Sequence, residues 1–163
     1  MIEVSGVVKD FKISKGLFRG KDILRAVDDV SLNIESGEVL AIVGESGCGK
    51  TTLARIILGL LPTDLGEVKF NGTALSDFKK LDLARLVQPI FQDPYSSLNP
   101  RKTIGEIIDL PLRVQGSRGG TDLKKLTLEN MDLVGLHSRM YDQYPNQLSG
   151  GQRQRVAIAR ALI

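Results

Sequence analysis

The sequence lacks tryptophan and contains one cysteine and one histidine, Cys48 and His137. A single cysteine cannot form a disulfide within the chain, which fits a reducing compartment. The same scarcity excludes a metal cluster built from cysteines and a zinc site built from several histidines. Aromatic residues make up only 5% of the chain, so the sequence does not favour stacking platforms for single-stranded nucleic acid.

Long apolar runs and blocks of like charge are also missing. The longest apolar stretches, residues 39–43 and 56–61, are far shorter than the ~20 residues that span a bilayer. The first residues show no basic region followed by an apolar core, so we expect no secretory signal. The net charge is +3, from 22 basic and 19 acidic residues, and indicates no basic surface for nucleic acid. We therefore expect a soluble chain that binds no nucleic acid.

An ordinary globular composition remains. The 163 residues are 42% hydrophobic and 25% charged, which is enough for one domain with its own core. Helical spacing of apolar residues predicts helices over residues 50–60, most of 104–136, and 152–163. Shorter apolar runs predict strands, although Pro89 weakens the last of them. These strands cover residues 2–8, 23–34, 38–43, 67–70 and 86–91. This order of elements indicates an α/β fold with a helical insert after residue 93.

A glycine-rich segment follows the predicted strand at residues 38–43 and opens the next helix. It matches the P-loop pattern of Gly, four residues, Gly-Lys-Ser/Thr, because it reads Gly44, Glu45, Ser46, Gly47, Cys48, Gly49, Lys50 and Thr51. Glycines allow backbone N–H groups to approach phosphate oxygens, and the helix dipole favours the same anion. Such a pattern also arises by chance, but its position between a buried strand and an amphipathic helix favours phosphate binding.

Individual P-loop residues have separate expected roles. Lys50 can reach the β- and γ-phosphates, and the Thr51 hydroxyl can ligate Mg²⁺. Thr52 adds a hydroxyl near the α-phosphate. Cys48 occupies a variable position, where a small loop side chain is favoured over a redox role. The expected ligand is therefore ATP with Mg²⁺.

A second loop of the same kind stands before the last predicted helix. It consists of Leu148, Ser149, Gly150, Gly151 and Gln152. Ser149 can cap the helix, and the two glycines leave backbone N–H groups accessible to an anion. From spacing alone, an ordinary helix cap is as good an explanation.

With its continuation Arg153-Gln154-Arg155, this loop resembles the signature motif of ATP-binding-cassette (ABC) ATPases. In that family the signature follows the P-loop by roughly one hundred residues, and a glutamine, the Q-loop, falls between them. Gln92 in Phe91-Gln92-Asp93-Pro94 matches that glutamine, although alone it could simply be a polar residue ending a strand. The three motifs in this order extend the resemblance over essentially the whole chain.

The resemblance implies a division of the chain and a partner. Residues 1–38 would form an antiparallel β part, 39–92 the P-loop core, 93–155 a helical subdomain, and 156–163 the return to the core. It also implies a head-to-tail dimer, in which each ATP lies between one subunit's P-loop and the signature of a second ABC ATPase subunit. Gln92 would contact Mg²⁺ or the attacking water. Phe11, with Phe18 as the alternative, would stack on adenine, although either ring could belong to the core.

Within the family, the sequence is similar to ATPases of oligopeptide and dipeptide importers. It rests on Phe91–Arg101 around the Q-loop, on Gly16–Arg19 and on Tyr144–Gln147. It implies peripheral association with the cytoplasmic face of the membrane through permease subunits, and indirectly a solute-binding protein. Related importers carry nickel or glutathione.

The sequence departs from the family where it stops. Family members continue with the Walker B strand, whose aspartate binds Mg²⁺ and whose glutamate is the general base, and then with a switch histidine. His137 precedes the signature and fits a surface helix residue instead. We therefore expect an N-terminal fragment that is inactive alone. Two alternatives stay open: a nucleotide-binding module that does not hydrolyse, and an ABC ATPase acting on nucleic acid.

Overall fold

The computed structural model describes residues 1–14, 21–93, 97–116 and 122–163. The chain divides into two compact units, Met1–Val87 and Gln88–Ile163. Each unit has its own cluster of buried apolar side chains. Within the described residues, no helix is both long and apolar enough to cross a membrane.

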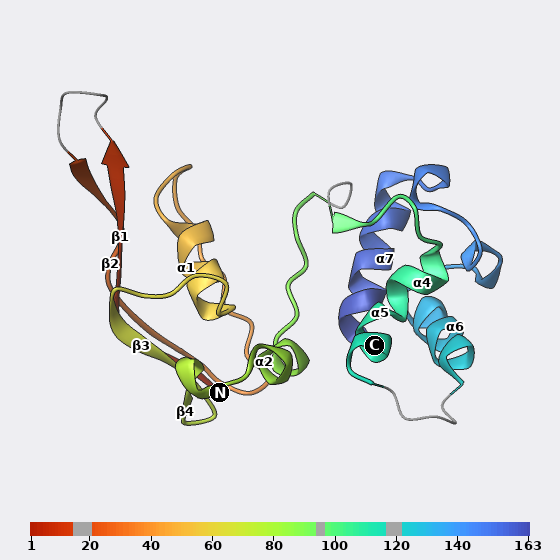
Figure 1. The fold of residues 1–163 in the computed structure, drawn as a ribbon, viewed down its shortest axis with the longest axis horizontal. Helices are drawn as coiled ribbons and strands as arrows, with labels where there is room; N and C mark the ends of the chain where they lie inside the picture. Colours follow the sequence, from red (N-terminus) through yellow and green to blue (C-terminus); the bar gives the residue numbers. More distant parts are fainter. Residues whose placement is uncertain (15–20, 94–96, 117–121) are drawn as a thin grey trace. The chain divides into compact units, whose positions relative to one another are not determined.

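The first unit is built on an antiparallel sheet (Figure 1). Its strands are β1 (Ile2–Ser14), β2 (Lys21–Ile34), β3 (Leu65–Phe70) and β4 (Thr73–Ala74), in the order β2-β1-β3-β4. Asn71 and Gly72 have positive φ angles of 47° and 79°, as the tight turn between β3 and β4 requires. The predicted strands at residues 2–8, 23–34 and 67–70 are therefore confirmed, although the first extends further than expected.

Helix α1 (Lys50–Ile57) supplies the other half of this core. Leu53, Ile56 and Ile57 lie at positions i, i+3 and i+4 of the helix, and all three are buried. They belong to one cluster with side chains of the sheet, namely Val4, Val7, Val27, Val68 and Phe70. The helix ends earlier than predicted, because Gly59 adopts φ 66° just after it, a common way to end a helix.

Two predicted strands do not form. Residues 38–43 and 86–91 are not in strands, and no described residue pairs with them. Val39 and Val43, expected to be covered on both faces, are 93% and 86% exposed. Their apolar pattern is real, but a strand requires hydrogen-bonding neighbours, and the four strands of the described sheet pair elsewhere. Short helices complete this unit: η1 (Leu75–Asp77) and α2 (Lys80–Leu86).

The second unit is helical, as predicted for most of residues 104–136 (Figure 1). Its α-helices are α4 (Ile104–Ile108), α5 (Leu110–Val114), α6 (Leu123–Leu133) and α7 (Gly150–Leu162). Two 3-10 turns, η2 (Ser138–Met140) and η3 (Pro145–Gln147), lie between α6 and α7. Ile104, Ile108, Met131 and Val156 are fully buried at its centre, so α4, α6 and α7 share one core.

Candidate functional site

The glycine-rich loop of the first unit, residues 44–49, is closed around the side chain of Lys50, which follows it. Lys50 Nζ donates to the carbonyl oxygens of Gly44, at 2.7 Å, and Glu45, at 2.6 Å. It also lies 3.6 Å from Cys48 Sγ. The Lys50 side chain therefore turns back over the loop, and its ammonium group lies against the carbonyls at the start of that loop.

Gly49 shows why glycine is needed at the turn into α1. It is the N-cap residue and adopts φ 97°, in the left-handed region. A Cβ atom at this position would lie 2.1 Å from the carbonyl oxygen of Ala26 in β2. The loop can therefore approach β2 only because Gly49 has no side chain.

The start of α1 is left open to a ligand. The cap residue makes no side-chain hydrogen bond, and the first turn contains no acidic residue. The first N–H groups of a helix have no partner within the helix, and together with the helix dipole they attract anions. Thr51, in the first turn, is exposed, and Thr52 is partly buried. This end of α1 therefore offers backbone donors, a hydroxyl and an ammonium group within one short segment, as a phosphate chain requires.

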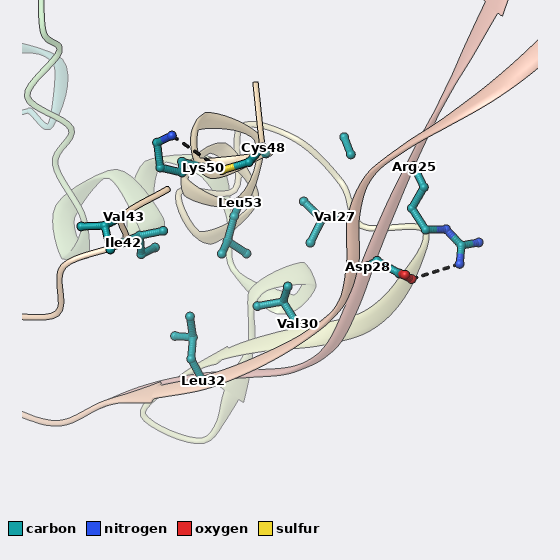
Figure 2. Close-up of a pocket in the computed structure, with 12 residues that line it drawn as sticks. Arg25, Val27, Asp28, Val30, Leu32, Ile42, Val43, Cys48, Lys50 and Leu53 are labelled. Atoms are coloured by element: carbon teal, nitrogen blue, oxygen red, sulfur yellow. Dashed lines mark hydrogen bonds and ion pairs between the residues drawn. The ribbon is translucent and has the colours of Figure 1, made fainter. Parts of the chain in front are cut away.

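A cavity of about 510 Å³ lies beside the loop, between β2, residues 42–43 and α1. Figure 2 shows Val27, Val30, Leu32 and Leu53 directed into it. Arg25 points away, with its guanidinium paired to Asp28. Cys48, Gly49 and Lys50 line the edge of the cavity next to the loop, so its walls are mostly apolar but include one ammonium group.

The expected adenine-stacking residue, Phe11, lies near the end of β1 and is 37% exposed. Lys9 Nζ lies 5.8 Å from the centroid of its ring. Lys9 in turn donates to Asp64 Oδ1 at 3.0 Å, and Asp64 Oδ2 accepts from the Asp10 N–H at 2.7 Å. The pKa of Asp64 is held below its usual value by these two hydrogen bonds, and the bond from the Asp10 amide has the larger effect. Phe18, the alternative, lies outside the described residues.

The second unit carries the signature loop at the start of α7. Ser149 is the N-cap and forms a capping box: Ser149 Oγ accepts from the Gln152 N–H at 3.3 Å, and Gln152 Oε1 accepts from the Ser149 N–H at 2.9 Å. Leu148 is buried in the core of this unit. A Cβ atom on Gly150 or Gly151 would meet no atom of the described chain within 4 Å. Packing inside the chain therefore gives no reason for these two glycines.

Three arginines of α7 fix the segments around the signature. Arg153 Nε donates to the Pro145 carbonyl at 2.6 Å, which fixes the approach to the loop. Arg155 Nη1 donates to the carbonyl of Gly135 at 3.1 Å, in the turn after α6. Arg160 Nη1 donates to the Ser97 carbonyl at 2.8 Å, and burial lowers the pKa of Arg160.

Gln92, the expected Q-loop residue, belongs to the second unit and is exposed. It directly follows residues 86–91, where a strand was expected and does not form. Its predicted contact with Mg²⁺ or water stays a prediction. Sequence reasoning missed Asp64 and Lys9, because they lie 55 residues apart and share no motif. It also missed the capping box of Thr103 and Glu106 at α4, although the Thr-x-x-Glu pattern is a recognised signal.

A glycine loop wrapped around a lysine at the start of an amphipathic helix defines the P-loop class of nucleotide-binding proteins. A model of the ABC transporter family matches residues 27–163, and the chain belongs to that family. It is 42% identical over 167 residues to the dipeptide transport ATP-binding protein DppF of Escherichia coli. It is 45% identical over 170 residues to the oligopeptide transport ATP-binding protein OppF of Haemophilus influenzae. In both comparisons all of this chain is matched.

The chain spans about half the length of these curated relatives, 50% of DppF and 51% of OppF. Among solved structures it resembles the dimeric bacterial ABC transporter cassette MJ0796, with a TM-score of 0.83 and 36% identity. That match covers 99% of this chain and 69% of the other. The predicted fold class, an ABC-type ATPase with an antiparallel N-terminal sheet and a helical part, is thereby confirmed. The division into residues 1–38, 39–92, 93–155 and 156–163 stays an interpretation.

Proposed function

We propose that this chain is the ATP-binding part of an ABC importer subunit. The subunit would bind and hydrolyse ATP to drive uptake of peptides or a related small solute. The observation that carries the proposal is the loop around Lys50, which joins an ammonium group to the uncapped start of α1. Lys50 would hold the β- and γ-phosphates, and the backbone of residues 44–49 would surround them.

Mg²⁺ would accompany the nucleotide. The exposed Thr51 hydroxyl at the start of α1 suits one coordination position, since oxygen is the donor this ion prefers. Gln92 would be the second group near the ion, supported by its place between the two loops in the sequence. With Thr51 and Gln92 holding it, the ion would supply positive charge to neutralise the phosphates.

A second ABC subunit would complete the site. Ser149 Oγ already accepts a hydrogen bond within its own chain, so its hydroxyl proton is free to be donated to a phosphate. Gly150 and Gly151 leave open space where side chains would otherwise stand. Both features suit close approach of another molecule's nucleotide, and the solved MJ0796 cassettes are dimeric. The arrangement would be head-to-tail.

The transport role rests on the relatives, whose printed names are dipeptide and oligopeptide transport ATP-binding proteins. The subunit would associate peripherally with the membrane at its cytoplasmic face, through permease subunits, and serve a solute-binding protein indirectly. Peptides are the substrate class that this likeness favours.

The direct test is a nucleotide titration of Lys50→Ala. We expect at least tenfold weaker binding of ATP with Mg²⁺, because the variant loses the only side-chain ammonium in the phosphate-binding segment. Lys80→Ala, which changes an exposed lysine at the start of α2, is the matched control and should bind like the unaltered chain. Equal affinity in Lys50→Ala and in the control would contradict the assignment of the loop.

A further inference from the structure

The strand that carries Phe11 loses one of its neighbours before it reaches that residue. β1 pairs with β3 only as far as Val8, which lies opposite Leu65. From Lys9 to Ser14, β1 pairs with β2 alone, and the β1–β2 ribbon extends past β3 in Figure 1. A two-stranded ribbon is marginally stable in water. Something beyond the strand pairing must therefore hold Phe11 in place.

Asp64 lies immediately before β3, at the point along β1 where the pairing between β1 and β3 ends. Its own N–H donates to the Val8 carbonyl at 2.9 Å, so its backbone is tied to β1. Its carboxylate then accepts from the Asp10 N–H at 2.7 Å and from Lys9 Nζ at 3.0 Å. The Asp64 side chain thus replaces the hydrogen bond that β3 would have given to the Asp10 N–H, and it also pairs with the Lys9 ammonium.

Lys9 links Asp64 to the aromatic ring of Phe11. It is only 7% exposed, and a lysine so deeply buried requires a paired charge. Asp64 supplies that charge, and the paired ammonium lies 5.8 Å from the centroid of the Phe11 ring. On the other strand, Arg25 holds the Asp10 carboxylate with Nε at 2.9 Å and Nη2 at 3.3 Å. Lys9 and Asp10 are therefore both tied to other elements.

We propose that Asp64, acting through Lys9 and the Asp10 amide, is a positioning residue that orients Phe11 as the platform for the nucleotide base. This inference rests on the proposed function, because it takes Phe11 to be the stacking residue. Asp64 does not touch the nucleotide. It fixes the ribbon before the ligand arrives, so that less ordering is needed when the base binds. The sequence following α1 thereby contributes to base recognition as well as to the sheet.

The test compares two ligands, ATP and inorganic triphosphate, by titration of the full chain. Their affinity ratio isolates the part of binding that depends on the nucleoside. Asp64→Ala should lower this ratio about three- to tenfold while triphosphate affinity stays unchanged, because loss of one stacking contact changes affinity over that range or more. Glu67→Gln is the matched control, since it breaks an exposed ion pair with Lys69 on the neighbouring β3 and should leave the ratio unchanged.

Two further variants separate this inference from the proposed function. Phe11→Ala should lower the ratio at least as much as Asp64→Ala, and the double variant should lower it no further than Phe11→Ala alone. Lys50→Ala should weaken both ligands together. An unchanged ratio in Asp64→Ala would overturn the positioning role, as would an equal loss for both ligands. If only Lys50→Ala failed to weaken binding, the phosphate assignment would be at fault instead.

Discussion

At the residue scale, two independent features of the structure require glycine at position 49. Its φ of 97° is unfavourable for any residue with a side chain, and its missing Cβ makes room for the carbonyl of Ala26. Glycine at this position thus serves the fold as well as the ligand. The P-loop pattern alone attributes it to phosphate access, and the approach of β2 adds a second cause.

Gly49→Ala should therefore destabilise the chain by about 3 kcal/mol, more than a positive φ angle alone would cause. Gly72→Ala is the comparison, since Gly72 has φ 79° but an added Cβ would meet nothing within 4 Å. We expect about 1 kcal/mol there. Urea unfolding of both variants measures the difference. Equal losses would show that the contact with Ala26 carries no cost.

At the scale of elements, the join between α4 and α5 depends on one ion pair. Asp109 ends α4 and begins α5, and its side chain is fully buried. Both of its carboxylate oxygens accept from Arg113, at 2.7 Å each. This contact raises the pKa of Arg113 above its ordinary value. The Arg113 side chain is 54% exposed, so water reaches one partner of the pair but not the other.

Arg113→Met should destabilise the chain, because it leaves a buried carboxylate without its charged partner. The partial exposure of Arg113 keeps this below the cost of breaking a fully buried pair. Lys69→Met, which removes one partner of an exposed pair in β3, should destabilise the chain less than Arg113→Met does. Denaturant unfolding tests both, and a loss no larger in Arg113→Met than in Lys69→Met would contradict this role of Asp109.

The predictions of α1 and of the start of α7 succeeded because both have local causes. α1 follows from apolar spacing and the glycine loop before it, and the start of α7 follows from Ser149 and Gln152, which bond to each other three residues apart. Residues 38–43 have an equally clear apolar pattern, but strand formation depends on partners distant in sequence. The link from Asp64 to Lys9 is likewise long-range and leaves no motif.

At the scale of the whole molecule, the P-loop and the signature loop belong to different units, each with its own core. Both loops place glycines at a helix start, yet only the P-loop has a lysine folded over it. The signature loop offers donors without a counter-charge. This difference fits the proposed dimer, in which the P-loop of each chain would face the signature loop of the other.

Ser149→Arg should spare nucleotide binding by one chain and prevent the association of two chains that ATP is expected to drive. The bulky cation would fill the open space beside Gly150 and Gly151 and remove the hydroxyl donor. Size-exclusion chromatography with and without ATP and Mg²⁺ reports this directly. Ser138→Arg, at an exposed serine of η2 in the same unit, is the control. Normal ATP-dependent association of Ser149→Arg would refute the role of the signature.

Because Lys50 donates to the carbonyls of Gly44 and Glu45, a bound phosphate would have to replace these carbonyl oxygens as its acceptors. The ammonium already has two oxygen acceptors, so a phosphate gains only the difference between its own attraction and theirs. Without that replacement, the ammonium stays bonded to two carbonyl oxygens of its own loop. If Lys50 binds the phosphates of ATP as proposed, weakening those carbonyl contacts should raise the affinity for ATP, and strengthening them should lower it.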